Sequence, residues 1–177
     1  VTMVSTWQTQ AGQQLTSTMT VTMDGRQADK PVVTFQPHVS ITAVDVPDPI
    51  PTGQRDIDDA GLANVNGVTQ SVQLAGDGNV AHNVASITIR DEPPSEAGGS
   101  AAGSATGLAD ATGSSSMVAT ATVNGMNAVA RLEGNAARVL LQIDGRGAVE
   151  QWIGGNGIGQ TIQLAADGQQ GSNWMAL

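Results

Sequence analysis

Two segments of this chain repeat each other. Residues 66–83 and 156–173 align without a gap, and half of their positions are identical. Each segment reads as a strand with apolar and polar residues in alternation, then an Asp-Gly turn, then a second strand. Neither copy holds a cluster of reactive side chains. Repetition on this scale indicates structural units that stack on one another, so the repeat predicts a scaffold.

The rest of the chain has the same β character. Met19, Val21 and Met23 alternate with threonine, which is the period of two that a half-buried strand requires. In the C-terminal third, hairpin signals such as Asn124-Gly125 and Asp167-Gly168 recur about every ten residues. Helical periodicity is weak everywhere. We therefore predict an all-β fold: an antiparallel meander, sandwich or solenoid-like sheets, with short hairpins and a long Gly/Ser/Ala-rich loop.

Composition divides the chain into three parts. Residues 1–90 are predicted to form an N-terminal β region, and residues 117–177 a C-terminal region of β-hairpin repeats. Residues 91–116 between them are rich in glycine, serine and alanine, which is typical of a flexible linker or surface loop.

Charge and composition exclude several classes of protein. The chain carries 16 acidic and 7 basic residues, a net charge of −9, whereas nucleic-acid binding and adsorption to anionic membranes need a basic surface. No apolar run is long enough for a transmembrane helix, so we expect no membrane insertion. Much Thr, Ser, Gln, Asn and Gly, a single lysine and a first residue other than methionine predict a secreted, extracellular or cell-surface protein.

Motifs for catalysis and for cofactors are missing from the sequence. There is no cysteine, no Gly-x-Ser-x-Gly elbow and no phosphate-binding Gly-x-x-x-x-Gly-Lys, while His38 and His82 lie far apart. Residues 45–59 contain five aspartates but lack the Asp-x-Asp-x-Asp-Gly loop of a calcium site; we read them as a solvated acidic loop and leave calcium binding open. The sequence predicts a protein that is not an enzyme and needs no cofactor.

Glutamine and asparagine recur at matching places in the two copies. These residues are Gln70, Gln73, Asn79, Gln160, Gln163 and Asn173. Amide side chains form hydrogen-bonded ladders when strands stack in register. From Gln73 to Ala81 and in the partner segment, the pattern of Gln, Gly, Asn and Ala resembles the repeats of curlin and of Pseudomonas-type functional amyloids. The spacing from Gln to Asn is one residue longer than in those families, and the copies here are not in tandem.

Together these features favour a structural subunit or accessory of an extracellular fibre, pilus or biofilm matrix. It would form a homo-polymer by β-strand addition between copies, with residues 3–8, 16–23 or 174–177 as the added strand. A core poor in aromatic residues and apolar segments near both ends of the chain motivate this mechanism. The side chains expected at the subunit interface are Met19, Val21, Met23, Trp152, Trp174 and Leu177.

Two alternatives stay open. Trp152 and Trp174 stand at the ends of apolar strands, where they would pack in a core or an interface, but a tryptophan can also stack on a sugar ring. The chain would then be a monomeric secreted module that binds glycans or a cell surface. A virion or phage-tail structural subunit shares the same sequence features. The expected partners are accordingly further copies of the chain, other fibre subunits or surface glycans.

Overall fold

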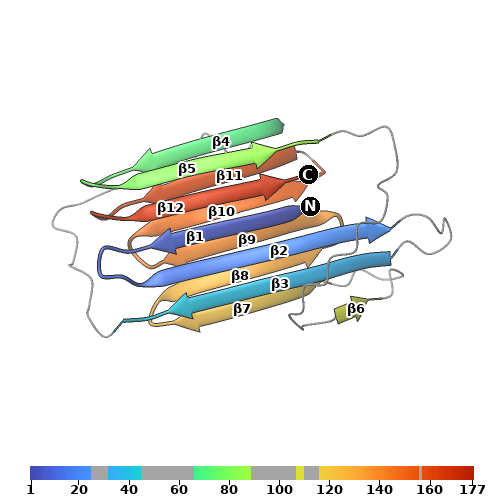
Figure 1. Cartoon of the computed structure of the whole chain (residues 1–177), viewed down its shortest axis with the longest axis horizontal. Helices are drawn as coiled ribbons and strands as arrows, with labels where there is room; N and C mark the ends of the chain where they lie inside the picture. Colours follow the sequence, from blue (N-terminus) through green and yellow to red (C-terminus); the bar gives the residue numbers. More distant parts are fainter. Residues whose placement is uncertain (25–31, 45–65, 89–106, 110–115, 156) are drawn as a thin grey trace.

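The computed structural model describes residues 1–24, 32–44, 66–88, 107–109, 116–155 and 157–177. These residues form strands and no helix, which confirms the all-β prediction (Figure 1). The strands are β1 (Thr2–Gln8), β2 (Gln14–Asp24), β3 (Val32–Thr42), β4 (Gly67–Leu74), β5 (Val80–Ser86), β6 (Gly107–Ala109), β7 (Met117–Val123), β8 (Met126–Glu133), β9 (Ala136–Ile143), β10 (Gly147–Gly154), β11 (Gly157–Leu164) and β12 (Gln170–Ala176).

The strands form two six-stranded sheets that lie face to face (Figure 1). Sheet A has the order β5-β12-β1-β2-β3-β6, and sheet B has the order β4-β11-β10-β9-β8-β7. Strands β4 and β5 therefore end the two sheets on the same side, at the top of Figure 1. Strands β6 and β7 end them on the other side.

Sheet B is an antiparallel meander from β7 to β11, as the closely spaced turn signals indicate. Asn124 and Gly125, which join β7 to β8, have φ angles of 48° and 77°, as a tight two-residue hairpin requires. The pairing places side chains of the same face in straight rows across all six strands. One such row contains Ala121, Ala128, Leu141, Val149, Ile162 and Val72.

The turns inside the two repeats are not hairpins, contrary to the expectation from Asp167-Gly168. Each turn carries the chain from sheet B to sheet A, so β4 faces β5 and β11 faces β12 across the core. The repeats pair with each other instead, β4 with β11 and β5 with β12, in parallel. The physical reason is that both strands of a repeat bury their apolar face in the same interior.

The core lies between the sheets and consists of two apolar clusters. One cluster is built around Trp7, Leu141 and Leu164, and the other around Met3 and Val139. Further aliphatic residues, alanine, methionine and a single phenylalanine, Phe35, complete the two clusters. The sparse aromatic content is thus compatible with a closed interior, because the sheets are broad and every long strand contributes to it.

The N- and C-terminal regions share both sheets. Strand β12 lies between β5 and β1, and β11 lies between β4 and β10, so strands from both sides of residues 91–116 interleave. Within that proposed linker only residues 107–109 and Ser116 are described, and residues 107–109 form β6, which pairs with β3. The rest of the proposed linker lies outside the described residues.

The repeat offers a matched pair of core substitutions. Leu164 is fully buried, whereas Leu74, at the same position of the other copy, is 43% exposed. Leu164→Ala is expected to lower the free energy of unfolding by about 2–5 kcal/mol, because it leaves a cavity in the core. Leu74→Ala removes a side chain only about half as buried and should cost about 1 kcal/mol. Chemical denaturation of the monomer measures both. Equal losses would contradict the asymmetry between the copies.

Candidate functional site

The candidate site is the contact between the two copies of the repeat. Strand β4 pairs with β11 and β5 with β12, and every paired residue lies 90 positions from its partner, as in Gly67 with Gly157 and Asn83 with Asn173. Identical and similar residues are therefore stacked directly on one another. This parallel, in-register arrangement of like segments is the geometry of a cross-β stack.

Amide side chains join the two copies like to like. The Nε2 of Gln70 donates to the Oε1 of Gln160 at 2.6 Å. The Nε2 of Gln163 donates to the Oε1 of Gln73 at 3.2 Å. On the other sheet, the Nδ2 of Asn173 donates to the Oδ1 of Asn83 at 2.9 Å. The structure thus brings together five of the six amide residues singled out in the sequence, each with its counterpart in the repeat.

The turns of the two repeats are stacked as well. The backbone N–H of Asp77 donates to the carboxylate of Asp167 at 2.7 Å, and the N–H of Gly168 donates to the carbonyl oxygen of Asp77 at 2.9 Å. Gly78 and Gly168 share a left-handed φ, 69° and 63°, which explains the glycine after each aspartate. The sixth predicted amide, Asn79, accepts a hydrogen bond from the backbone N–H of Gln169 at 2.8 Å, and its buried Nδ2 has no partner among the described residues.

The hydrogen bonds continue beyond the repeats into the core. Gln160 donates from Nε2 to the Oε1 of Gln151 at 3.3 Å, and Gln151 donates from Nε2 to the Oγ of Ser5 at 2.9 Å. Ser5 in turn donates to the Oδ1 of Asn173 at 2.6 Å. We call the connected set the amide network. Its members are Gln70, Gln160, Gln151, Ser5, Asn173 and Asn83.

Ser5 and Gln151 were not among the residues predicted from the sequence. For Gln151 a signal was present, because a tight turn near Gly155 makes β10 and β11 antiparallel and places Gln151 opposite Gln160. The sequence contains no such signal for Ser5. Both are fully buried, as are Gln160 and Asn173. Burying an amide or a hydroxyl is unfavourable unless it is hydrogen-bonded, so the network stabilises one register of the strands and penalises others.

The residues expected at a subunit interface occupy several different environments. Met19 is buried in the core of the chain itself, and Val21 and Leu177 pack against the same cluster. Trp152 is half-buried and lies over Gly159, where a Cβ atom would come within 1.9 Å of the indole ring. Trp174 is 42% exposed on the outer face of sheet A. The side chain of Met23 lies outside the described part of the chain.

The strands expected to be added to a neighbour lie inside sheet A. Strands β1, β2 and β12 are each paired on both sides within the same chain. Among the described strands, the free edges belong to β4, β5, β6 and β7, and to the part of β3 that β6 does not reach. Strand addition would therefore use these edges.

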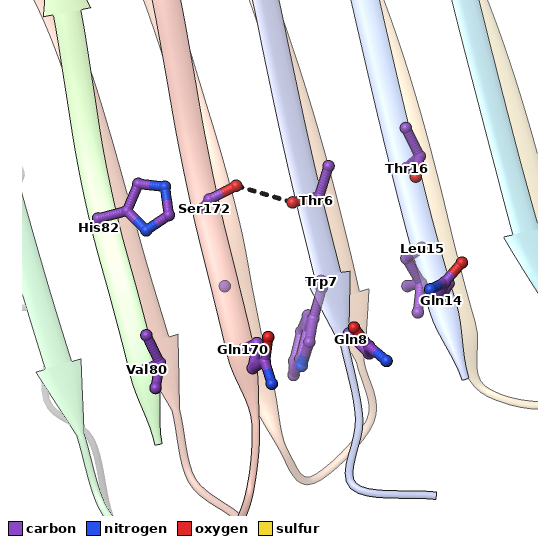
Figure 2. A pocket seen from close by; sticks show the side chains of 11 residues that line it. Thr6, Trp7, Gln8, Gln14, Leu15, Thr16, Val80, His82, Gln170 and Ser172 are labelled. Carbon is purple, nitrogen blue, oxygen red and sulfur yellow. Dashed lines mark hydrogen bonds between the residues drawn. The ribbon is translucent and has the colours of Figure 1, made fainter. Parts of the chain in front are cut away.

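A shallow groove crosses the outer face of sheet A (Figure 2). Its lining contains no Asp, Glu, Lys or Arg, and His82 supplies its one imidazole. Within the groove, the hydroxyls of Thr6 and Ser172 share a hydrogen bond of 2.7 Å. The lining residues are Thr6, Trp7, Gln8, Gln14, Leu15, Thr16, Val80, His82, Gln170, Gly171 and Ser172. The groove offers hydroxyl and amide groups for hydrogen bonding.

Metal-binding and membrane-spanning features can be assessed only for the described part of the chain. There, no three His, Asp or Glu side chains gather into a group that could hold a metal ion. The five aspartates of residues 45–59 lie outside the described residues. No helix that could span a membrane occurs in the part of the chain that the structure describes.

The amide network can be tested by removing its central member. Gln151→Ala removes one of the two acceptors of the Gln160 Nε2, which still donates to the carbonyl oxygen of Val84, and it removes the donor to the Oγ of Ser5. Each buried polar group left unsatisfied should lower the free energy of unfolding by about 1–3 kcal/mol. Gln142→Ala is the control, because Gln142 is exposed on the neighbouring strand β9 and should change stability by no more than about 0.5 kcal/mol. Denaturant titration distinguishes them. Similar small effects for both variants would mean that the network does not stabilise the fold.

The chain is similar over its whole length to a curated protein, the functional amyloid subunit FapE of Pseudomonas aeruginosa, with 31% identity over 181 aligned residues. The chain spans 65% of that protein's length. No family model and no solved structure matches the chain. The resemblance to functional amyloids, which the sequence suggested for the two repeats alone, thus extends along the whole chain.

Proposed function

We propose that this protein is a structural subunit or accessory of an extracellular amyloid-type fibre or biofilm matrix, and that it acts by self-assembly and not by catalysis. One observation carries the proposal: two copies of one motif stack in parallel and in register, with like amides hydrogen-bonded to each other. Amyloid fibres are built from that same contact between chains.

The similarity to FapE supports the proposal independently. That protein is named as a functional amyloid subunit, and the alignment covers all of the chain described here. Secretion and a place in an extracellular matrix follow from such a role. The low lysine content and the abundance of small polar residues are compatible with it.

Strand addition supplies the mechanism. Among the described residues no strand pairs with the backbone N–H and C=O groups of the free sheet edges, and an additional strand would pair with them. Both sheets end together on each side of the molecule, so a second molecule can continue both at once (Figure 1). Each junction would then extend the core as well as the hydrogen bonding.

Incubation of the purified protein tests this function. Filaments are expected in electron micrographs, and aligned filaments should diffract at about 4.7–4.8 Å along the axis and about 10 Å across it, the spacings of strands and of stacked sheets. Raising the ionic strength should speed assembly, because it screens the repulsion between chains of net charge −9. A protein that stays monomeric at every concentration and ionic strength would contradict the proposal.

A second candidate function rests on Trp174. Its exposed indole lies between Val84 and Val4 on neighbouring strands of sheet A, which gives an apolar surface beside polar side chains. Such a surface suits stacking against a sugar ring. If the chain binds glycans there, soluble polysaccharide will shift the tryptophan fluorescence of the wild type and not of Trp174→Ala. An unchanged wild-type spectrum at saturating polysaccharide would exclude this site.

A further inference from the structure

The edge formed by β4 and β5 is the place where the stack of repeats stops (Figure 1). Val72 and Leu74 on β4 are each 43% exposed, whereas their counterparts Ile162 and Leu164 are fully buried beneath β4. A Cβ atom on Gly157 would lie 2.1 Å from the carbonyl oxygen of Gly67. One on Gly67 would meet nothing within 4 Å. The first repeat therefore leaves exposed, on its own free edge, the same kind of surface that it covers on the second repeat.

The middle of this edge is polar. The Nε2 of Gln70 donates a hydrogen bond to the Oε1 of Gln160, whereas the Oε1 of Gln70 accepts none from the described residues. Asn83 lies opposite, with its Nδ2 bonded to the carbonyl oxygens of Ser71 and Gln160 at 2.9 and 3.3 Å. Gln70 and Asn83 thus stand at the same height on the two sheets. They are the exposed end of the amide network.

The opposite end of the molecule does not match this chemistry. Following the row of Gln70 across sheet B leads through Gln160, Gln151, Val139 and Ala130 to Ala119 on β7. Stacking copies head to tail would place Ala119 of one copy beside Gln70 of the next. The Oε1 of Gln70 would then be buried without a donor, which is unfavourable.

The described residues of this edge lack the charged and proline side chains that usually protect a sheet edge. Strands β4 and β5 contain no lysine, arginine, carboxylate or proline, the residues with which soluble proteins block unwanted pairing. An unprotected edge with half-exposed valine and leucine on its inner face is suited to a partner that shares its pattern. A second copy of the chain has the same pattern on its own β4–β5 edge.

We propose that a second copy of this chain docks on the β4–β5 edge, related by a two-fold axis that passes near Gln70 and Asn83. A two-fold axis makes the paired strands antiparallel, β4 with β4 and β5 with β5. Gln70 and Asn83 then face their own counterparts, and the amide network continues into the second copy. Val68 of one copy faces Val72 of the other, so apolar side chains meet on both sides of the amide.

The two-fold dimer rests on the proposed function and refines it by naming the partner and the surface. It has two identical outer ends, each formed by β6 and β7, so any growth from the dimer proceeds in both directions. Head-to-tail stacking through β7, which also runs parallel to β4, is the competing arrangement.

Cysteine cross-linking separates the two arrangements, since the chain has no cysteine of its own. With the axis at Gln70, Thr69 of one copy pairs with Ser71 of the other. An equimolar mixture of Thr69→Cys and Ser71→Cys should form a disulfide-linked dimer on mild oxidation. In head-to-tail stacking Ser71 would instead face Thr120 on β7. Cross-linking of Ser71→Cys with Thr120→Cys, without the first product, would overturn the proposal.

Sedimentation of the full-length chain gives a second test. Val72→Lys places a charge on the inner face of the edge and should convert a wild-type dimer into a monomer. Thr120→Lys, which places the same charge on an exposed residue of the other edge strand, β7, should leave the dimer intact. Measuring the melting temperature of Val72→Lys checks that its monomer is folded. A wild type that never dimerises, or a Val72→Lys protein that still does, would refute the proposal.

The two proposals fail separately. Filaments that form without any β4–β5 dimer would refute the dimer and leave the fibre function standing. A β4–β5 dimer that never yields filaments would support the docking surface and contradict the fibre function.

Discussion

The buried amide network is the constraint on which the rest of the structure depends. Gln151, Gln160, Asn173 and Ser5 are fully buried, and each needs its partners at hydrogen-bonding distance. Shifting one strand by a residue would turn its side chains to the other face and leave buried amides unpaired. The network crosses from sheet B to sheet A, so it fixes the registers within each sheet and the alignment between them.

Small side chains make this arrangement workable. Alanine and valine leave little apolar area to hold two sheets together. Three methionines form one buried row of sheet A, Met3, Met19 and Met175. Flexible thioethers adapt to irregular gaps. Because the core is thin, specific hydrogen bonds and strand pairing determine which strands are neighbours more than the shapes of large side chains do.

The network also gives the molecule two unlike ends. The central row is amide-rich near β4 and β5 and becomes aliphatic toward β7, through Val139, Ala130 and Ala119. The chemistry of each end determines which partners that end accepts. Within one chain, the two copies of the repeat already show the like-to-like amide pairing that the proposed dimer would continue.

Much of the strand content was predictable from local patterns. Alternation of apolar and polar residues marked β2, closely spaced glycine turns marked the meander from β7 to β11, and the repeat identified the amides that pair with each other. These signals are local, or they compare two segments of the same sequence. The Asp-Gly turns of the repeats misled the prediction, because a turn that reverses the chain within one sheet and a turn that crosses to the facing sheet use the same residues.

The sequence by itself determined most of the strands, most of their inner faces and the amides of the repeats, since each is encoded by side-chain alternation or by matching residues. Only the tertiary structure decided that β12 lies between β5 and β1, that the repeats pair in parallel, and that Ser5 and Gln151 complete the network. Ser5 and Gln151 are 146 residues apart in the chain. No local preference brings such groups together. Burial of the apolar strand faces does, and the observed pairing is the one that leaves neither polar group buried without a hydrogen bond.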